Sequence, residues 1–179
     1  LLLSQKEAMT TLILKVDENG ETKEKGVVFL PALPLPNNYQ DGDYLFNLRL
    51  VIPAACPISR NGIVWINVPE DADTPFERSK YHKRAIENSF KCDNELDFKI
   101  YKPGSYNYYI SYRDDSNHLK TTRKFYFVVP PSLYINNEFI PLNAIALESV
   151  ISKWLGPRTN WDNVFNEISK KNYNMVHFT

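Results

Sequence analysis

Apolar residues recur at every second position over residues 44–52 of this sequence. Tyr44, Phe46, Leu48, Leu50 and Ile52 share one face of the segment, with Asn47 and Arg49 on the other. This period is typical of a strand that lays one face on a core. The same kind of pattern predicts further strands over residues 11–16, 26–30, 63–68, 96–100, 106–112 and 125–129.

Turn residues separate these predicted strands. Asn19-Gly20 predicts a hairpin between the first two strands, residues 102–104 predict a turn into a returning strand, and residues 114–117 predict another turn. Pro130-Pro131 ends the last strand. Short strands with turn signals between them predict an antiparallel β-sandwich, so the fold is expected to be mainly β.

The proline-rich segment 31–36 has two interpretations. Its Pro-x-x-Pro spacing fits an SH3-type groove, which would make the chain a proline-rich adaptor whose binding is lost on Pro34→Ala. The commoner use of such a segment is an extended crossover between two sheets.

Three stretches carry helix signals. Thr74-Pro75-Phe76-Glu77 resembles a capping box and predicts a short helix toward Phe90. The basic residues within 80–84 of this helix would form either a solvated face or a contact to a partner domain. Asn143 precedes an apolar stripe at helical spacing that ends at Leu155, and Asn160 precedes a second one. Each stripe contains a tryptophan, Trp154 in the first and Trp161 in the second. We predict that both are core residues; the alternative is that their rings stack on sugars.

The last residues, 173–179, mix aromatic and aliphatic side chains without a charge after the second of these helices. This pattern predicts a buried strand of a parallel sheet. Parallel sheets are built from repeated βα units, so a single such strand would lack partners for its backbone and its apolar side chains. We therefore expect these 179 residues to be the front part of a longer protein.

Residues 141–156, PLNAIALESVISKWLG, and above all residues 171–179, KNYNMVHFT, resemble the eukaryotic glycogen debranching enzymes, in particular the fungal form. The resemblance implies that residues 132–179 begin a 4-α-glucanotransferase domain, contributing two helices and the first strand of a (β/α)₈ barrel of the α-amylase type. Residues 9–131 would be an N-terminal β-sandwich domain. Residues 1–8 precede Met9, and we expect them to be upstream translation or disordered.

The same resemblance implies an enzyme of glycogen breakdown with 4-α-glucanotransferase and amylo-α-1,6-glucosidase activities. Its partners would be glycogen or maltooligosaccharide and the barrel domain of its own chain, and its catalytic carboxylates would follow Thr179. The 179 residues alone would be inactive and would serve a structural or glycogen-contacting role. The alternative is a stand-alone β-sandwich that binds carbohydrate or a protein partner without enzymatic activity.

Composition excludes several other classes. With 43% hydrophobic and 13% aromatic residues the chain is globular, and its 21 basic residues equal its 21 acidic ones, so no net field attracts nucleic acid or an anionic membrane. No apolar run approaches the ~18 residues of a membrane span. The two cysteines have neither metal-site spacing nor the density of a secreted disulfide scaffold, which favours a cytoplasmic protein.

Candidate chemistry is sparse. No catalytic, cofactor-binding or metal-binding residue is predicted, because the three histidines stand apart from other ligand types and the acidic residues fall in turns or on a solvent face. Tyr109 is the one candidate for sugar stacking, since it faces away from Tyr106 and Tyr108 on the same predicted strand. The alternative is that the tyrosines of this strand serve only the core, with their hydroxyls at its rim.

Overall fold

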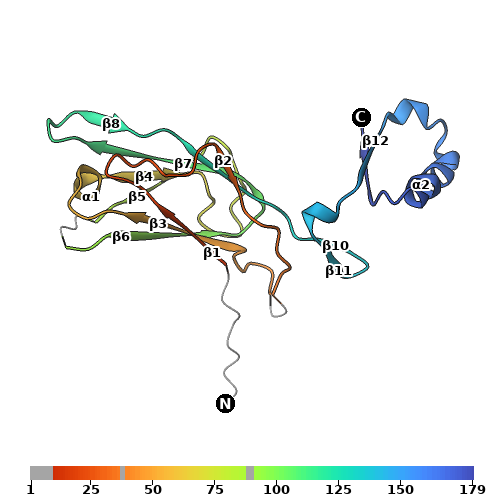
Figure 1. The fold of residues 1–179 in the computed structure, drawn as a ribbon, viewed down its shortest axis with the longest axis horizontal. Coiled ribbons are helices and arrows are strands. Elements are labelled where there is room, and N and C mark those ends of the chain that lie inside the picture. The colour runs from red at the N-terminus through yellow and green to blue at the C-terminus, as the bar shows by residue number, and fades with distance from the viewer. Residues whose placement is uncertain (1–9, 37–38, 88–90) are drawn as a thin grey trace, which may run out of the picture. The chain divides into compact units, whose positions relative to one another are not determined.

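The computed structural model describes residues 10–36, 39–87 and 91–179, so the expectation for residues 1–8 lies outside the described residues. These residues form two compact units that divide between Pro131 and Ser132. The first unit is built almost entirely of strands, and the second contains short strands and one longer helix (Figure 1).

The first unit is a sandwich of two sheets (Figure 1). One sheet has the strand order β1-β3-β6, with β1 at Thr11–Lys15, β3 at Phe46–Ile52 and β6 at Asn94–Ile100. The other has the order β2-β9-β7-β4-β5, with β2 at Val27–Phe29, β9 at Phe125–Val129, β7 at Gly104–Arg113, β4 at Ile63–Ile66 and β5 at His82–Ala85. Strand β8, Leu119–Thr121, also pairs with β7. The β-sandwich expected from the sequence is confirmed.

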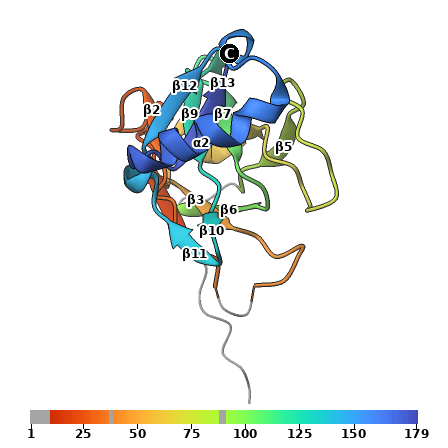
Figure 2. The same cartoon turned by 90° about the vertical axis from the view of Figure 1, so that its right-hand side faces the viewer.

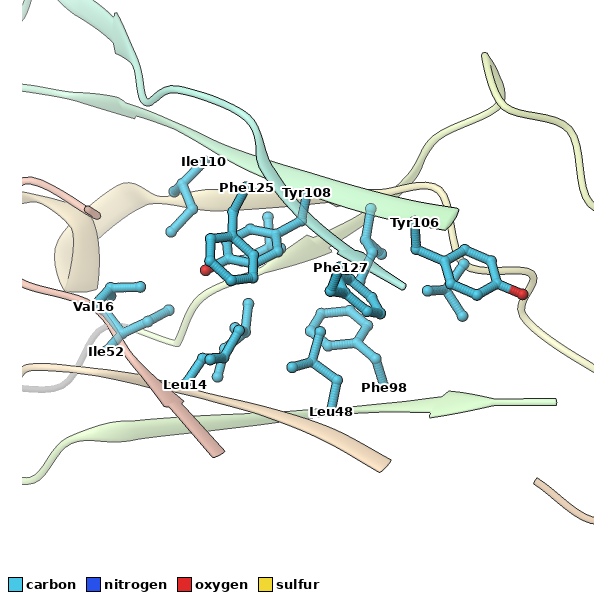
Figure 3. Close-up of a cluster of buried hydrophobic side chains, with 14 of the residues drawn as sticks. Leu14, Val16, Leu48, Ile52, Phe98, Tyr106, Tyr108, Ile110, Phe125 and Phe127 are labelled. Atoms are coloured by element: carbon cyan, nitrogen blue, oxygen red, sulfur yellow. The ribbon is translucent and has the colours of Figure 1, made fainter. Parts of the chain in front are cut away.

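The core of the sandwich lies between the two sheets (Figure 3). The period-two pattern of residues 44–52 is confirmed, because Phe46, Leu48, Leu50 and Ile52 are all buried on β3. The opposite sheet contributes four aromatic rings to the same core, next to aliphatic side chains; the rings are those of Tyr106, Tyr108, Phe125 and Phe127.

The hairpin predicted at Asn19-Gly20 is wrong. A turn does form there, since the Asp17 carboxylate accepts hydrogen bonds from the backbone N–H groups of Asn19 and Glu21, but only one bridge, Val16 to Thr22, follows it. The next residues, Lys23-Glu24-Lys25, carry no apolar alternation that would extend the pairing. Strand β1 instead runs parallel to β3, and β2 runs parallel to β9 in the other sheet.

The turn over residues 102–104 also has a different role from the one predicted. Strands β6 and β7 alternate as expected, but β6 pairs with β3 whereas β7 pairs with β4 and β9. Both strands present apolar residues to one core, but from opposite sheets. They therefore show the same alternation of apolar and polar residues although they are not paired with each other. The turn at residues 114–117 is confirmed: it joins the antiparallel pair β7 and β8, and the Asp114 carboxylate accepts from the backbone N–H groups of Ser116 and His118.

The helix predicted from Thr74 is wrong for the described part of that stretch, residues 74–87, which contains β5 and no helix. The expected N-cap forms a different turn, because Asp71 accepts hydrogen bonds from the backbone N–H groups of Asp73 and Thr74. Residues 88–90, the end of that prediction, lie outside the described residues. A short helix that the sequence did not reveal, α1 at Pro57–Asn61, begins at the cap residue Cys56.

The second unit contains a hairpin followed by a βαβ unit. The hairpin consists of β10, Leu133–Ile135, and β11, Glu138–Ile140, which pair antiparallel. Strand β12, Leu147–Val150, then leads through helix α2, Trp161–Lys170, to β13, Met175–Phe178, which pairs parallel to β12. Three single turns of 3₁₀ helix lie between these elements, at Leu142–Ala144, Ser152–Trp154 and Arg158–Asn160.

The helix predicted to run from Asn143 to Leu155 is therefore wrong, while the final strand is confirmed and has β12 as its partner. The predicted burial of this strand is wrong for the described chain, since Met175 and Phe178 are exposed. The β-branched pair Val150-Ile151 favours extended backbone, and Pro141 and Pro157 leave little length for a helix. The assignment of Trp154 to a helical core is also wrong, since its side chain is 81% exposed.

Helix α2 lies next to the last strand, β13 (Figure 2), and two of its aromatic residues contact Phe178 of that strand. Trp161 lies over Phe178, with ring centroids 5.6 Å apart and planes 19° from parallel. Phe165 meets the same ring edge-on at 6.1 Å. The predicted packing role of Trp161 is thus confirmed, and the contact fixes α2 against the parallel pair.

Asn174 joins the two ends of this βαβ unit, because its side-chain oxygen accepts from the Ala146 N–H at 2.8 Å and its amide donates to the Ala144 carbonyl at 2.8 Å. Asn174→Ala is expected to destabilise the unit by about 1 to 2 kcal/mol, since both backbone groups lose their partner. Hydrogen exchange at the Ala146 amide measures the effect. Asn166→Ala, on the exposed surface of α2, is the control and should leave that exchange unchanged; equal protection in both variants would contradict the prediction.

Two buried tyrosines on β7 differ in one hydrogen bond. The Tyr106 hydroxyl donates to the Lys102 carbonyl at 2.7 Å, whereas the Tyr108 hydroxyl has no hydrogen-bond partner among the described residues. Tyr106→Phe is expected to cost about 1 kcal/mol, and Tyr108→Phe to be neutral or slightly stabilising, because it removes a buried polar group that is unpaired. Urea unfolding of the two variants side by side tests the contrast, and a larger loss for Tyr108→Phe would refute it.

Alkaline pH provides a second readout for the same pair. Burial raises the pKa of Tyr106 to about 12, and burial, with a smaller effect of Glu24 and Glu21, raises the pKa of Tyr108 further. A raised pKa in the folded state means that the stability is complete below pH about 10 and falls as the pH rises through about 12. The double variant Tyr106→Phe, Tyr108→Phe should flatten this fall.

Candidate functional site

The outward face of the larger sheet carries the one residue that the sequence proposed for sugar contact. Along β7, Tyr106, Tyr108 and Ile110 point into the core, so the residues between them point outward. Tyr109 is one of these and is half-buried. The structure therefore gives Tyr109 a partly accessible ring on a sheet surface.

Trp65 lies beside Tyr109 on the neighbouring strand β4. The two residues are direct cross-strand partners, their ring centroids are 6.2 Å apart and their planes deviate by only 9° from parallel. The Trp65 indole N–H donates to the Ser111 hydroxyl at 2.8 Å, which fixes the orientation of the indole ring. We call Trp65 and Tyr109 the aromatic platform.

Tyr81 borders the platform. Its ring meets Tyr109 edge-on, with centroids 5.3 Å apart. Its hydroxyl donates to the Asn107 side-chain oxygen at 2.6 Å and accepts from the Lys124 ammonium at 2.9 Å. That ammonium also lies 5.8 Å from the Tyr109 ring centroid. The hydrogen bond to Tyr81 is the main reason why the pKa of Lys124 is raised, so the lysine remains a cation here.

Two buried asparagines hold the segment that carries Tyr81 on the sheet. The Asn67 side-chain oxygen accepts from the Asn107 N–H at 2.8 Å, and the Asn67 amide donates to the Arg78 carbonyl at 3.1 Å. Both asparagines are almost fully buried; Asn67 uses its side-chain oxygen and its amide in this network, and the Asn107 side-chain oxygen accepts from Tyr81. Because unpaired buried amides are costly, the network fixes residues 78–81 next to the platform.

Tyr81, which contacts Tyr109 of the platform, also lines a surface groove. Its lining is polar and aromatic, and consists of Arg78, Ser79, Tyr81, Ser105, Asn107, Lys124 and Tyr126. Two of these residues are cations and none is a carboxylate. The groove therefore offers mainly hydrogen-bond donors together with two tyrosine rings, an arrangement that suits a ligand rich in oxygen lone pairs.

The sequence pattern predicts Tyr109 as a candidate but does not indicate its neighbours. It predicts a strand that contains Trp65, and it gives no functional signal for Trp65, Tyr81 or Lys124. The alternation of each strand gives the outward direction of Trp65, but cross-strand register decides that it lies against Tyr109.

The basic residues 80–84 belong to no helix. Among them, His82 Nδ1 lies 3.3 Å from a Glu70 carboxylate oxygen.

Other kinds of site find little support in the described part of the chain. No cluster of three His, Cys, Asp or Glu residues that could hold a metal ion occurs among the described residues. Among the helices of residues 10–36, 39–87 and 91–179, none has the length and apolar character to span a membrane. The Asp114 carboxylate is engaged by backbone N–H groups, which lower its pKa, so it serves the turn.

Comparisons with known proteins cover both units. Residues 48–136 match the model of the N-terminal domain from the human glycogen debranching enzyme, and residues 138–179 match that of the glucanotransferase domain of glycogen debranching enzymes. The chain is 47% identical to a glycogen debranching enzyme of Saccharomyces cerevisiae over 174 residues, which cover 94% of this chain. It spans 11% of the length of that relative.

Proposed function

Because this chain belongs to the glycogen debranching enzyme family, we propose that it is the N-terminal part of an enzyme that removes branches from glycogen. The enzyme would transfer a maltosaccharide from a branch to a chain end and then hydrolyse the remaining α-1,6-linked glucose. The observation that supports this most directly is the identity of 47% to the yeast relative, which runs through both units.

The residues of this chain would not perform the chemistry. Glycoside cleavage needs two carboxylates across the scissile bond, and in barrels of the α-amylase type these lie at the ends of later strands. Residues 132–179 would begin the glucanotransferase domain, and the parallel pair β12 and β13 with α2 supports this role because barrels are built from βαβ units. The sandwich would be a non-catalytic domain of a cytoplasmic enzyme.

Product analysis tests the proposal. The purified full-length protein is incubated with a branched maltooligosaccharide and, separately, with a linear one of similar length. The branched substrate should yield free glucose together with lengthened linear chains, whereas the linear substrate should yield only redistributed chain lengths. Chain redistribution without glucose release would remove the glucosidase half of the proposal, and the absence of both products would remove all of it.

A further inference from the structure

The outward face of the larger sheet combines an aromatic platform with a donor-rich groove, and neither is required by the catalytic role of the family. We propose that this face binds a segment of α-1,4-glucan, with Trp65 and Tyr109 stacking on glucose rings and the groove lined by Tyr81 binding the hydroxyls. The choice of glucan as ligand rests on the proposed function.

The platform is suited to stacking because both of its rings are partly accessible and held in place by their neighbours. The apolar C–H face of a pyranose packs on an aromatic face, where it removes the ring surface from water. Trp65 is fixed by its hydrogen bond to Ser111, and Tyr109 contacts the rings of Trp65 and Tyr81. Side chains that are already ordered lose little conformational entropy when a ligand binds, so more of the contact energy appears as affinity.

The groove supplies the polar half of the site. Arg78 and Lys124 provide charged donors, while Ser79 and Ser105 provide hydroxyls that both donate and accept. With two cations and no carboxylate in the lining, the groove requires a ligand that offers oxygen lone pairs. A glucan offers these on every residue, next to the apolar ring faces that the platform requires. A nucleic acid fits less well, since the chain as a whole has no excess of basic residues.

Such a site would act by holding substrate near the enzyme. A glucan bound to the sandwich raises the local concentration of other branches of the same molecule at the catalytic domains, without any new chemistry. The benefit applies to a large branched polymer and not to a short oligosaccharide that cannot reach both places. The site should therefore affect activity on glycogen selectively.

The test uses the full-length protein and two platform variants, Trp65→Ala and Tyr109→Ala. Retardation in native gels that contain glycogen should show roughly tenfold weaker binding for each variant, as loss of one stacked ring implies. The KM for glycogen should rise while kcat on a short branched oligosaccharide stays unchanged. Tyr109→Phe, which keeps the ring, should bind as the parent does, and so should Phe29→Ala, which removes an exposed ring from β2 of the same sheet.

Unchanged glycogen retardation in Trp65→Ala and Tyr109→Ala would overturn the proposal. A second result would also overturn it: Trp65→Ala lowers the melting temperature of the full-length protein, Phe29→Ala does not, and glycogen binding is unchanged. The face would then be covered by another domain of the same protein. Failure of the proposed function gives a different result: no product forms from either substrate, and the retardation of the variants still decides whether the face binds glucan.

Discussion

Phe127→Ala is expected to destabilise the sandwich by about 3 to 5 kcal/mol. Phe127 is fully buried on β9, and its ring lies 5.7 Å from that of Tyr106, within the core between the two sheets (Figure 3). Truncation to alanine loses the transfer free energy of the ring and leaves a cavity that rigid neighbouring strands cannot fill. The loss is a large share of the about 5 to 15 kcal/mol that stabilises a typical domain.

Urea unfolding followed by far-ultraviolet circular dichroism measures this change through the midpoint and slope of the transition. Phe29→Ala is the matched control, since Phe29 belongs to the strand that pairs with β9 but is 73% exposed. It should change the free energy of unfolding by less than about 0.5 kcal/mol. Similar effects of the two substitutions would show that Phe127 does not lie in a packed core.

Gly62→Ala is expected to cost about 2 to 3 kcal/mol, although alanine would normally suit the backbone angles at this position. A Cβ at Gly62 would lie 2.5 Å from the Ile58 carbonyl oxygen and 2.6 Å from the Ile86 Cδ1. The carbonyl belongs to helix α1 and accepts the hydrogen bond of the Gly62 N–H, so it cannot move away without breaking the end of the helix. The clash therefore shifts backbone instead of one flexible side chain.

Gly26→Ala separates this steric effect from a conformational one. Gly26 has a positive φ of 84°, and a Cβ there meets no atom within 4 Å. Its substitution should cost about 1 kcal/mol, from backbone strain alone. Thermal unfolding of both variants tests the order, and a smaller loss for Gly62→Ala than for Gly26→Ala would contradict the close packing around α1.

The period-two pattern predicted the strands of the sandwich well, because alternation directly reports a face that lies on a core. Strand β3 shows this most clearly, since each apolar residue of its pattern from Phe46 to Ile52 is buried. The pattern does not report the partner. Strands β6 and β7 both alternate and follow one another, but they belong to different sheets, and β1 and β2 pair in parallel with strands far away in the sequence.

The two wrong helices have a common cause. The signals at Thr74 and Asn143 are local cap and spacing signals, and neither segment gains a packed helical face that would stabilise a short helix. Residues 147–150 form strand β12 because β13 provides a parallel partner from beyond α2. Pairing over this sequence distance overrides local propensity and cannot be deduced from the segment itself.

The candidate site was predictable only in part. Alternation along β7 placed Tyr109 on the outer face, and that prediction agrees with its half-buried ring. The contacts that define the platform come from the register of β4 on β7 and from the buried pair Asn67 and Asn107, which holds Tyr81 in position. These contacts join residues far apart in the chain, so no local sequence pattern indicates them. Sugar binding at Tyr109 itself stays a prediction.

The mass of the native polypeptide tests the central claim most directly. An antibody to residues 101–112 would recover the protein, and mass spectrometry of the intact chain and of its peptides would follow. A debranching enzyme predicts a chain many times longer than 179 residues, with peptides that continue past Thr179 into a barrel domain. A native chain that ends at Thr179 would contradict this account.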